Sequence, residues 1–115
     1  MYFEKEEHGD VTVVCLTEDR LDAAMAIRFK DSLKALVDEG VEHMVLDMKN
    51  VGFMDSSGLG AVVAHMKYMG TERVFEICGL SPTVEKVFKL TRMDSVFKIY
   101  PDVDTALAED ARKAG

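Results

Sequence analysis

The succession of structural elements is clearest in the segment Met44–Gly70, which reads MVLDMKNVGFMDSSGLGAVVAHMKYMG. It begins with the apolar run Met44–Met48, which is typical of a buried strand. After a loop, apolar residues recur at helical spacing from Leu59 to Met69, and the glycine that follows is a common helix terminator. The polar group Asp55–Gly58 stands where the helix should start. This segment therefore predicts a strand, a loop and a helix in that order.

The same alternation of strands and helices continues on both sides of this segment. Further strands are expected at Tyr2–Glu6, Val11–Leu16, Arg73–Cys78 and Val96–Tyr100. Helices are expected after Asp22, which can act as an N-cap, after Ser81 with Pro82 in the first turn, and after Asp102. Helices of this length between strands imply right-handed crossovers onto a largely parallel sheet, preceded by a hairpin that turns at Gly9–Asp10. The expected fold class is α/β.

Composition limits the kinds of protein this chain can be. Its 115 residues fit one compact domain, and 48% hydrophobic residues argue against disorder. A net charge of -7 argues against nucleic acid or an anionic membrane as the main partner and favours a partner with a basic patch. Cys15 and Cys78 lie in apolar runs and are expected to be reduced core thiols, not a disulfide or a metal site. With no signal peptide and no apolar run of membrane-spanning length, a cytoplasmic protein is expected.

The group Asp55–Gly58 has several possible roles. An aspartate or a serine at a helix start accepts hydrogen bonds from free backbone N–H groups, and one such side chain is enough for this capping. The second hydroxyl and the glycines Gly58 and Gly60 therefore need another explanation. Small residues in a first turn leave an anion-binding helix end open, where a phosphorylated serine would be tolerated. A phosphate there would change what the surface can bind without changing the fold.

Catalytic alternatives find less support in the sequence. The chain lacks the G-x-S-x-G elbow of a nucleophilic serine and both glycine-rich phosphate-binding motifs. His8, His43 and His65 are expected to be solvated surface residues, because none stands where it could act as a base for the serines. A receiver-like domain remains an alternative, in which Asp47 or Asp55 would accept phosphate with Mg²⁺.

The segment VLDMKNVGFMDSSGLGAVVAHMK resembles the signature of the anti-sigma factor antagonists, also called anti-anti-sigma factors, which are single-domain STAS proteins. The likeness extends to RLDAA and to ICGLSPTVEKVFKLTRMDSVFKIYPDVDTALA, and so covers nearly the whole chain. It implies a single STAS domain over residues 1–113. It also implies a mixed, largely parallel sheet of four or five strands, with about four helices packed mainly on one side.

The resemblance also implies a function and its residues. Ser56, directly after the aspartate, would accept phosphate from a partner that is both anti-sigma factor and serine kinase, and a separate phosphatase would remove it. Asp22, Asp55, Ser57, Gly58 and Leu59 would form the partner-binding surface, and Met54, at the loop tip, is expected to be an exposed contact. No catalytic activity, cofactor or metal is expected. An alternative is a STAS subunit of another assembly, such as a stress-signalling complex or a lipid transporter.

Overall fold

The computed structural model describes residues 3–114, with side chains described as far as Arg112. It contains a five-stranded sheet in the spatial order β1-β2-β4-β6-β7. Its strands are β1 (Phe3–His8), β2 (Val11–Leu16), β4 (His43–Asp47), β6 (Val74–Cys78) and β7 (Lys98–Tyr100). The first two form an antiparallel hairpin, and every other pairing is parallel. The expected mixed, largely parallel sheet is confirmed.

Four α-helices connect or follow these strands. They are α1 (Ala23–Asp38), α2 (Ser56–Met69), α3 (Pro82–Leu90) and α4 (Val103–Ala114), with a short 3-10 helix η1 (Met93–Ser95) before β7. The expected caps are confirmed: Ser81 accepts a hydrogen bond from the Val84 N–H, and Asp102 accepts one from the Thr105 N–H. The α2 helix ends at Gly70, whose φ of 73° is the left-handed conformation that glycine adopts freely.

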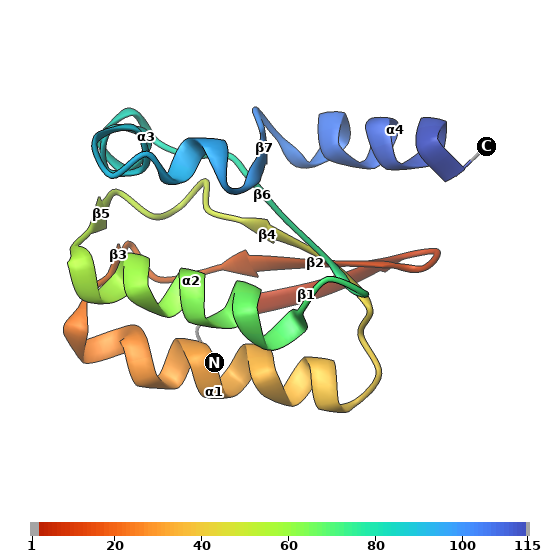
Figure 1. Cartoon of the computed structure of the whole chain (residues 1–115), viewed down its shortest axis with the longest axis horizontal. Coiled ribbons are helices and arrows are strands. Elements are labelled where there is room, and N and C mark those ends of the chain that lie inside the picture. The colour runs from red at the N-terminus through yellow and green to blue at the C-terminus, as the bar shows by residue number, and fades with distance from the viewer. Residues whose placement is uncertain (1–2, 115) are drawn as a thin grey trace.

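Strand alternation divides the apolar side chains between the two faces of the sheet. The larger core lies on the face covered by α1 and α2 and includes Phe29, Leu33, Met44, Leu46 and Phe88. The opposite face is covered by α4, where Ala106 packs against Val13, Val45 and Cys78. Figure 1 shows α4 across the sheet from α1 and α2. The helices therefore lie mainly on one side, and α4 is the exception.

The expected strand limits differ in detail from those observed. The first strand was expected at Tyr2–Glu6, but it runs from Phe3 to His8; Tyr2 lies outside the described residues. The expected strand Val96–Tyr100 contains only Lys98–Tyr100, because η1 and its C-cap occupy the preceding residues. Both cysteines are free thiols. Cys78 is fully buried, which raises its pKa to about 12, whereas Cys15 is only half-buried.

A second, two-stranded sheet was not expected from the sequence. It pairs β3 (Arg20–Leu21) with β5 (Phe53–Met54) in parallel, so that Arg20 lies opposite Phe53 and Leu21 opposite Met54. Each strand has two residues, too few for an alternating pattern to be visible. Figure 1 shows this small sheet at the end of the molecule where α1 and α2 begin. No helix in the described part of the chain is both long and apolar enough to cross a membrane.

Candidate functional site

The N-termini of α1 and α2 are held together by the side chain of Asp55. Its Oδ1 accepts a hydrogen bond from the Gly58 N–H at 2.9 Å, which caps α2. Its Oδ2 accepts a hydrogen bond from the Ala23 N–H at 3.2 Å, in the first turn of α1. One carboxylate therefore binds free N–H groups of both helices. The short parallel pairing of β3 and β5, directly before the two helices, brings these ends together.

Asp22 caps the other helix, α1. Its Oδ1 accepts a hydrogen bond from the Ala24 N–H at 3.1 Å, and its Oδ2 accepts one from Arg20 Nε at 3.0 Å. The hydrogen bond from Arg20 lowers the pKa of Asp22 below its usual value. The Arg20 guanidinium also lies over the ring of Phe53, 4.6 Å from its centroid. The two acidic caps, with Arg20 and Phe53 beside them, therefore belong to one surface.

Gly58 allows α2 to approach β3 closely. A Cβ atom at this position would lie 1.9 Å from the carbonyl oxygen of Leu21 and 2.8 Å from its carbonyl carbon. These are backbone atoms, which cannot rotate away as a side chain could. Gly60, one residue beyond Leu59, has no atom within 4 Å of such a Cβ. Of the two glycines in the motif, Gly58 is thus required by packing and Gly60 is not.

Ser56 is the first residue of α2 and is exposed, as is Ser57. A residue in this position lies at the positive end of the helix dipole, beside backbone N–H groups of the first turn. The residue is accessible from the solvent. The arrangement meets the physical requirement for phosphorylation at this serine; the modification itself stays a prediction.

The other expected contact residues are distributed differently. Met54 is only 4% exposed, so the prediction that it is an exposed contact is wrong. It is the second residue of β5 and belongs to the core, whereas its neighbour Phe53 is 40% exposed. Gly58 and Leu59 are also buried in the isolated chain, because they face β3 and the core. These three residues lie beneath the exposed side chains and support them. Their role in partner binding stays a prediction.

Sequence reasoning missed two exposed residues of this surface, Arg20 and Phe53. Their positions next to Asp22 and to the motif were visible, but only the pairing of β3 with β5 shows that they meet. Ile27, in the second turn of α1, is 67% exposed and is a further large apolar side chain near the start of that helix. Exposed aromatic and arginine side chains are enriched in protein–protein interfaces.

The receiver-like alternative finds little support in this geometry. Asp47 is 3% exposed at the end of β4, and its Oδ1 accepts a hydrogen bond from the Lys49 N–H at 3.0 Å. Both oxygens of Asp55 are used by backbone N–H groups. Within residues 3–114, neither aspartate belongs to a group of three side chains that could hold a metal ion. An acyl phosphate with Mg²⁺ would need such a group.

The histidines depart from the expectation that all three are solvated. His65 is 2% exposed on the inner side of α2, and its ring contacts Phe75 edge-on with the centroids 4.9 Å apart. Burial lowers its pKa to about 4, so it is neutral near pH 7. His43 is half-buried between Glu76 and Asp110. Only His8 is well exposed, so the prediction is wrong for His65 and holds in part for His43.

The mixed sheet, the helix α4 on one face and the paired starts of α1 and α2 on the other define a small α/β domain. Residues 2–106 match the family model of the STAS domain, so the chain belongs to the STAS domain family. The expectation drawn from the sequence signature is confirmed at the level of the family.

Several known proteins resemble this chain over nearly its full length. The anti-sigma F factor antagonist of Paenibacillus polymyxa is 29% identical over 115 residues, which cover 95% of this chain and 94% of that protein. The crystal structure of an anti-sigma factor antagonist from Mycobacterium paratuberculosis has a TM-score of 0.84 and 28% identity, covering 93% of this chain and 91% of that one. The Bacillus protein SpoIIAA in its phosphorylated form has a TM-score of 0.70 at 20% identity, covering 95% and 98% of the two chains. This last likeness shows the fold alone.

Proposed function

We propose that this chain is an anti-sigma factor antagonist controlled by phosphorylation of Ser56. In the unphosphorylated state it binds an anti-sigma factor that is also a serine kinase, and the sigma factor is released. Phosphorylation of Ser56 ends this binding, and a separate serine phosphatase restores it. Such a protein acts on transcription in the cytoplasm. The observation that carries the proposal is an exposed serine at the first position of α2, beside the N-terminus of α1.

The proposed binding surface consists of the side chains exposed around the two helix starts. Arg20, Phe53 and Ser57 are exposed, and Asp22 and Asp55 are half-buried between them. The buried residues Met54, Gly58 and Leu59 hold this surface in place. The net charge of -7 favours a kinase with a basic docking patch.

Charge explains how one phosphate would end the binding. A phosphoserine carries a charge of about -1.5 to -2 at neutral pH. At the first position of α2 the helix dipole and the free N–H groups stabilise that charge, so the fold is kept. In a closed interface the same charge would lose its water and lie beside the carboxylates of Asp22 and Asp55, which is costly. A loss of about 1.4 kcal/mol already weakens binding tenfold.

Phosphate mapping tests the proposed site. The chain is incubated with its cognate kinase and ATP, and the product is analysed by mass spectrometry. We expect one phosphate on Ser56, no phosphate in Ser56→Ala and normal phosphorylation of the matched control Ser57→Ala. Phosphate on Ser57 alone would contradict the assignment. A hydroxylamine-labile phosphate on Asp47 or Asp55 would favour the receiver-like alternative instead.

A titration of the kinase tests the charge mechanism separately. Without ATP, Ser56→Ala should bind the kinase with the same affinity as the wild type, because the surface keeps its shape. Ser56→Asp should bind at least about tenfold more weakly, since it places a charge at the same helix start. Equal affinities of the two variants would show that charge at this position does not control binding. Association with a membrane permease in place of a kinase would favour a STAS subunit of a transporter.

A further inference from the structure

A separate cluster of polar side chains lies where α4 packs against β4 and β6. His43 Nε2 is 2.8 Å from Glu76 Oε1 and 3.1 Å from Asp110 Oδ2. The three residues come from two strands and a helix, and their ligand-type atoms all lie within 4.8 Å of one another. They are far apart in the sequence, so no spacing motif indicates them. Nothing in the proposed phosphorylation switch uses this cluster.

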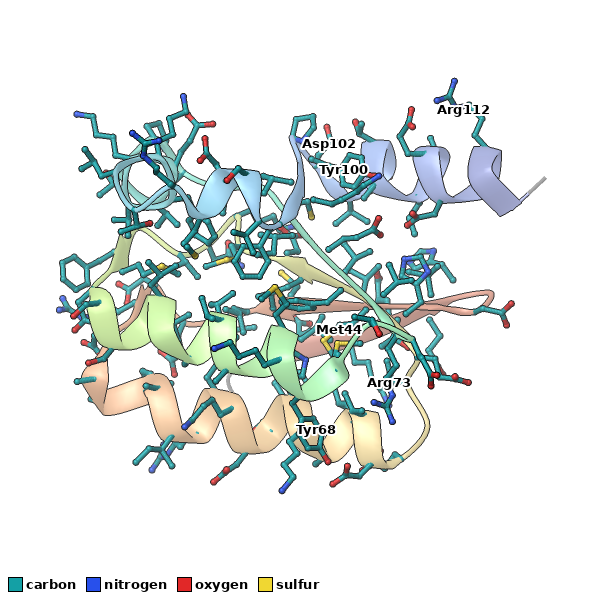
Figure 2. All side chains as sticks on the ribbon, viewed as in Figure 1. Met44, Tyr68, Arg73, Tyr100, Asp102 and Arg112 are labelled. Atoms are coloured by element: carbon teal, nitrogen blue, oxygen red, sulfur yellow. The ribbon has the colours of Figure 1, made fainter. Side chains whose placement is uncertain are left out.

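His43 alone cannot donate a hydrogen bond to both carboxyl groups of the cluster. One ring nitrogen carries at most one hydrogen, yet two carboxylate oxygens point at His43 Nε2. If that hydrogen is donated to Glu76, Asp110 Oδ2 has none, and this buried atom has no hydrogen-bond donor within the described part of the chain. The second oxygen of Glu76 lies 3.4 Å from the hydroxyl of Tyr100. Figure 2 shows Tyr100 at the junction of β7 and α4.

The two carboxyl groups of the cluster are also shielded from water. The side chains of Glu76 and Asp110 are only 3% and 10% exposed, and that of His43 is 20% exposed. Two carboxyl groups therefore face one imidazole ring with little access to water. Burial of an uncompensated charge is strongly unfavourable, and a bound cation is one of the usual remedies.

The surroundings leave room for an ion and for a water molecule bound to it. The cluster opens on a surface cavity of about 510 Å³, which is also lined by Arg73, Val74, Phe75 and Lys98. Arg73 donates a hydrogen bond from its guanidinium to the Met69 carbonyl at 3.1 Å, which directs part of this group toward the end of α2. Lys98 lies opposite Glu76 in the β6–β7 register and also lines this cavity.

We propose that His43, Glu76 and Asp110 bind one divalent transition-metal ion of the Zn²⁺ type. A nitrogen and two carboxylate oxygens are suitable ligands for Zn²⁺, with water in the fourth position. Ligands of a tetrahedral Zn²⁺ ion lie about 3.4 Å apart. His43 Nε2 is 2.8 and 3.1 Å from the two carboxyl oxygens, and all three atoms lie within 4.8 Å of one another. The ion would place a positive charge between the two carboxyl groups and occupy the unpaired position at Asp110 Oδ2. Because the ligands join α4 to β4 and β6, it would cross-link the C-terminal helix to the sheet.

Zinc titration of chelator-treated protein tests the site. Isothermal titration calorimetry with ZnCl₂ should show one ion per chain, and the midpoint of thermal unfolding should rise with Zn²⁺. Asp110→Asn and His43→Gln should each weaken binding at least tenfold. The exposed His8→Gln is the matched control and should bind as the wild type does. Co²⁺ in place of Zn²⁺ should give visible absorption bands of a tetrahedral site in the wild type and not in Asp110→Asn.

Three results would overturn the proposal. The first is the absence of saturable Zn²⁺ binding to the folded wild type. The second is equal binding by the wild type, Asp110→Asn and His43→Gln, which would locate the ion elsewhere. The third is a wild type whose unfolding midpoint does not change with Zn²⁺, together with a Glu76→Gln variant that unfolds at a higher temperature than the wild type. This result would show that the two carboxyl groups share a proton in place of a metal. Circular dichroism of each variant shows whether it is folded before its binding is compared.

Discussion

Replacement of Gly58 by alanine tests how closely α2 must approach β3. The new Cβ would lie 1.9 Å from the Leu21 carbonyl oxygen, far inside van der Waals contact, and the atom in its way belongs to the backbone. Relief requires that the first turn of α2 move away from β3. That movement also strains the hydrogen bonds by which Asp55 joins Gly58 to Ala23. Overpacking costs about 1–3 kcal/mol when side chains can adjust, so we expect a loss of about 3 kcal/mol or more here.

The matched control is Gly60→Ala in the same helix. Its Cβ would enter open space, and alanine is favoured over glycine in a helix by about 0.5–1 kcal/mol. For a domain of this size, 1 kcal/mol corresponds to a shift of about 4 °C in the unfolding midpoint. We therefore expect Gly58→Ala to unfold about 12 °C below the wild type and Gly60→Ala about 2–4 °C above it. Thermal and urea unfolding by circular dichroism measure both. If Gly58→Ala were as stable as Gly60→Ala, the close approach at Leu21 would not exist as described.

Two further predictions concern the buried His65 and the half-buried helix cap Ser81. The pKa of His65 is about 4 in the folded chain, against 6.5 for a free imidazole, so below pH 6.5 the unfolded chain takes up a proton that the folded chain does not. This contribution to stability is complete above pH 6.5 and falls by about 3 kcal/mol as the pH decreases to 4. His65→Leu should lose this part of the pH dependence in urea unfolding series, and an unchanged slope would refute the assignment. Ser81 Oγ donates to the Val51 carbonyl at 3.0 Å and accepts from the Val84 N–H at 3.3 Å. Ser81→Ala should therefore cost about 1–2 kcal/mol, whereas Ser57→Ala should cost little; similar losses would show that the cap is unimportant.

The order of the four helices and the five strands of the main sheet was accessible from the sequence because local chemistry marks the helix ends. Asp22, Ser81 with Pro82, and Gly70 stand at helix limits for reasons that involve only their neighbours in the chain. The apolar runs between them have the lengths of buried strands. The motif that indicates the family and the helix start at Ser56 lie within one continuous segment. Their recognition therefore required no information about contacts between distant residues.

Features that depend on distant contacts were not accessible in the same way. Met54 was expected at an exposed loop tip, but the pairing of β5 with β3 turns it inward. The sequence did not show this pairing, because the two strands are more than thirty residues apart. The joining of three residues into the cluster on α4 depends on the same kind of contact. His65 is a different case. It lies three residues after Val62 on the buried stripe of α2, so periodicity could have placed it inside, and the usual solvation of histidine misled the interpretation.

The double role of Asp55 changes how substitutions on this surface should be interpreted. Its carboxylate is a tether between two helices, so Asp55→Ala would let the helix starts drift apart even if no partner ever touched the side chain. Weaker binding of an Asp55 variant would therefore not show that Asp55 contacts the partner, because displacement of the helix starts would weaken binding as well. Substitutions of exposed residues that do not join the two helices, such as Phe53 and Ser57, indicate more directly where a partner binds.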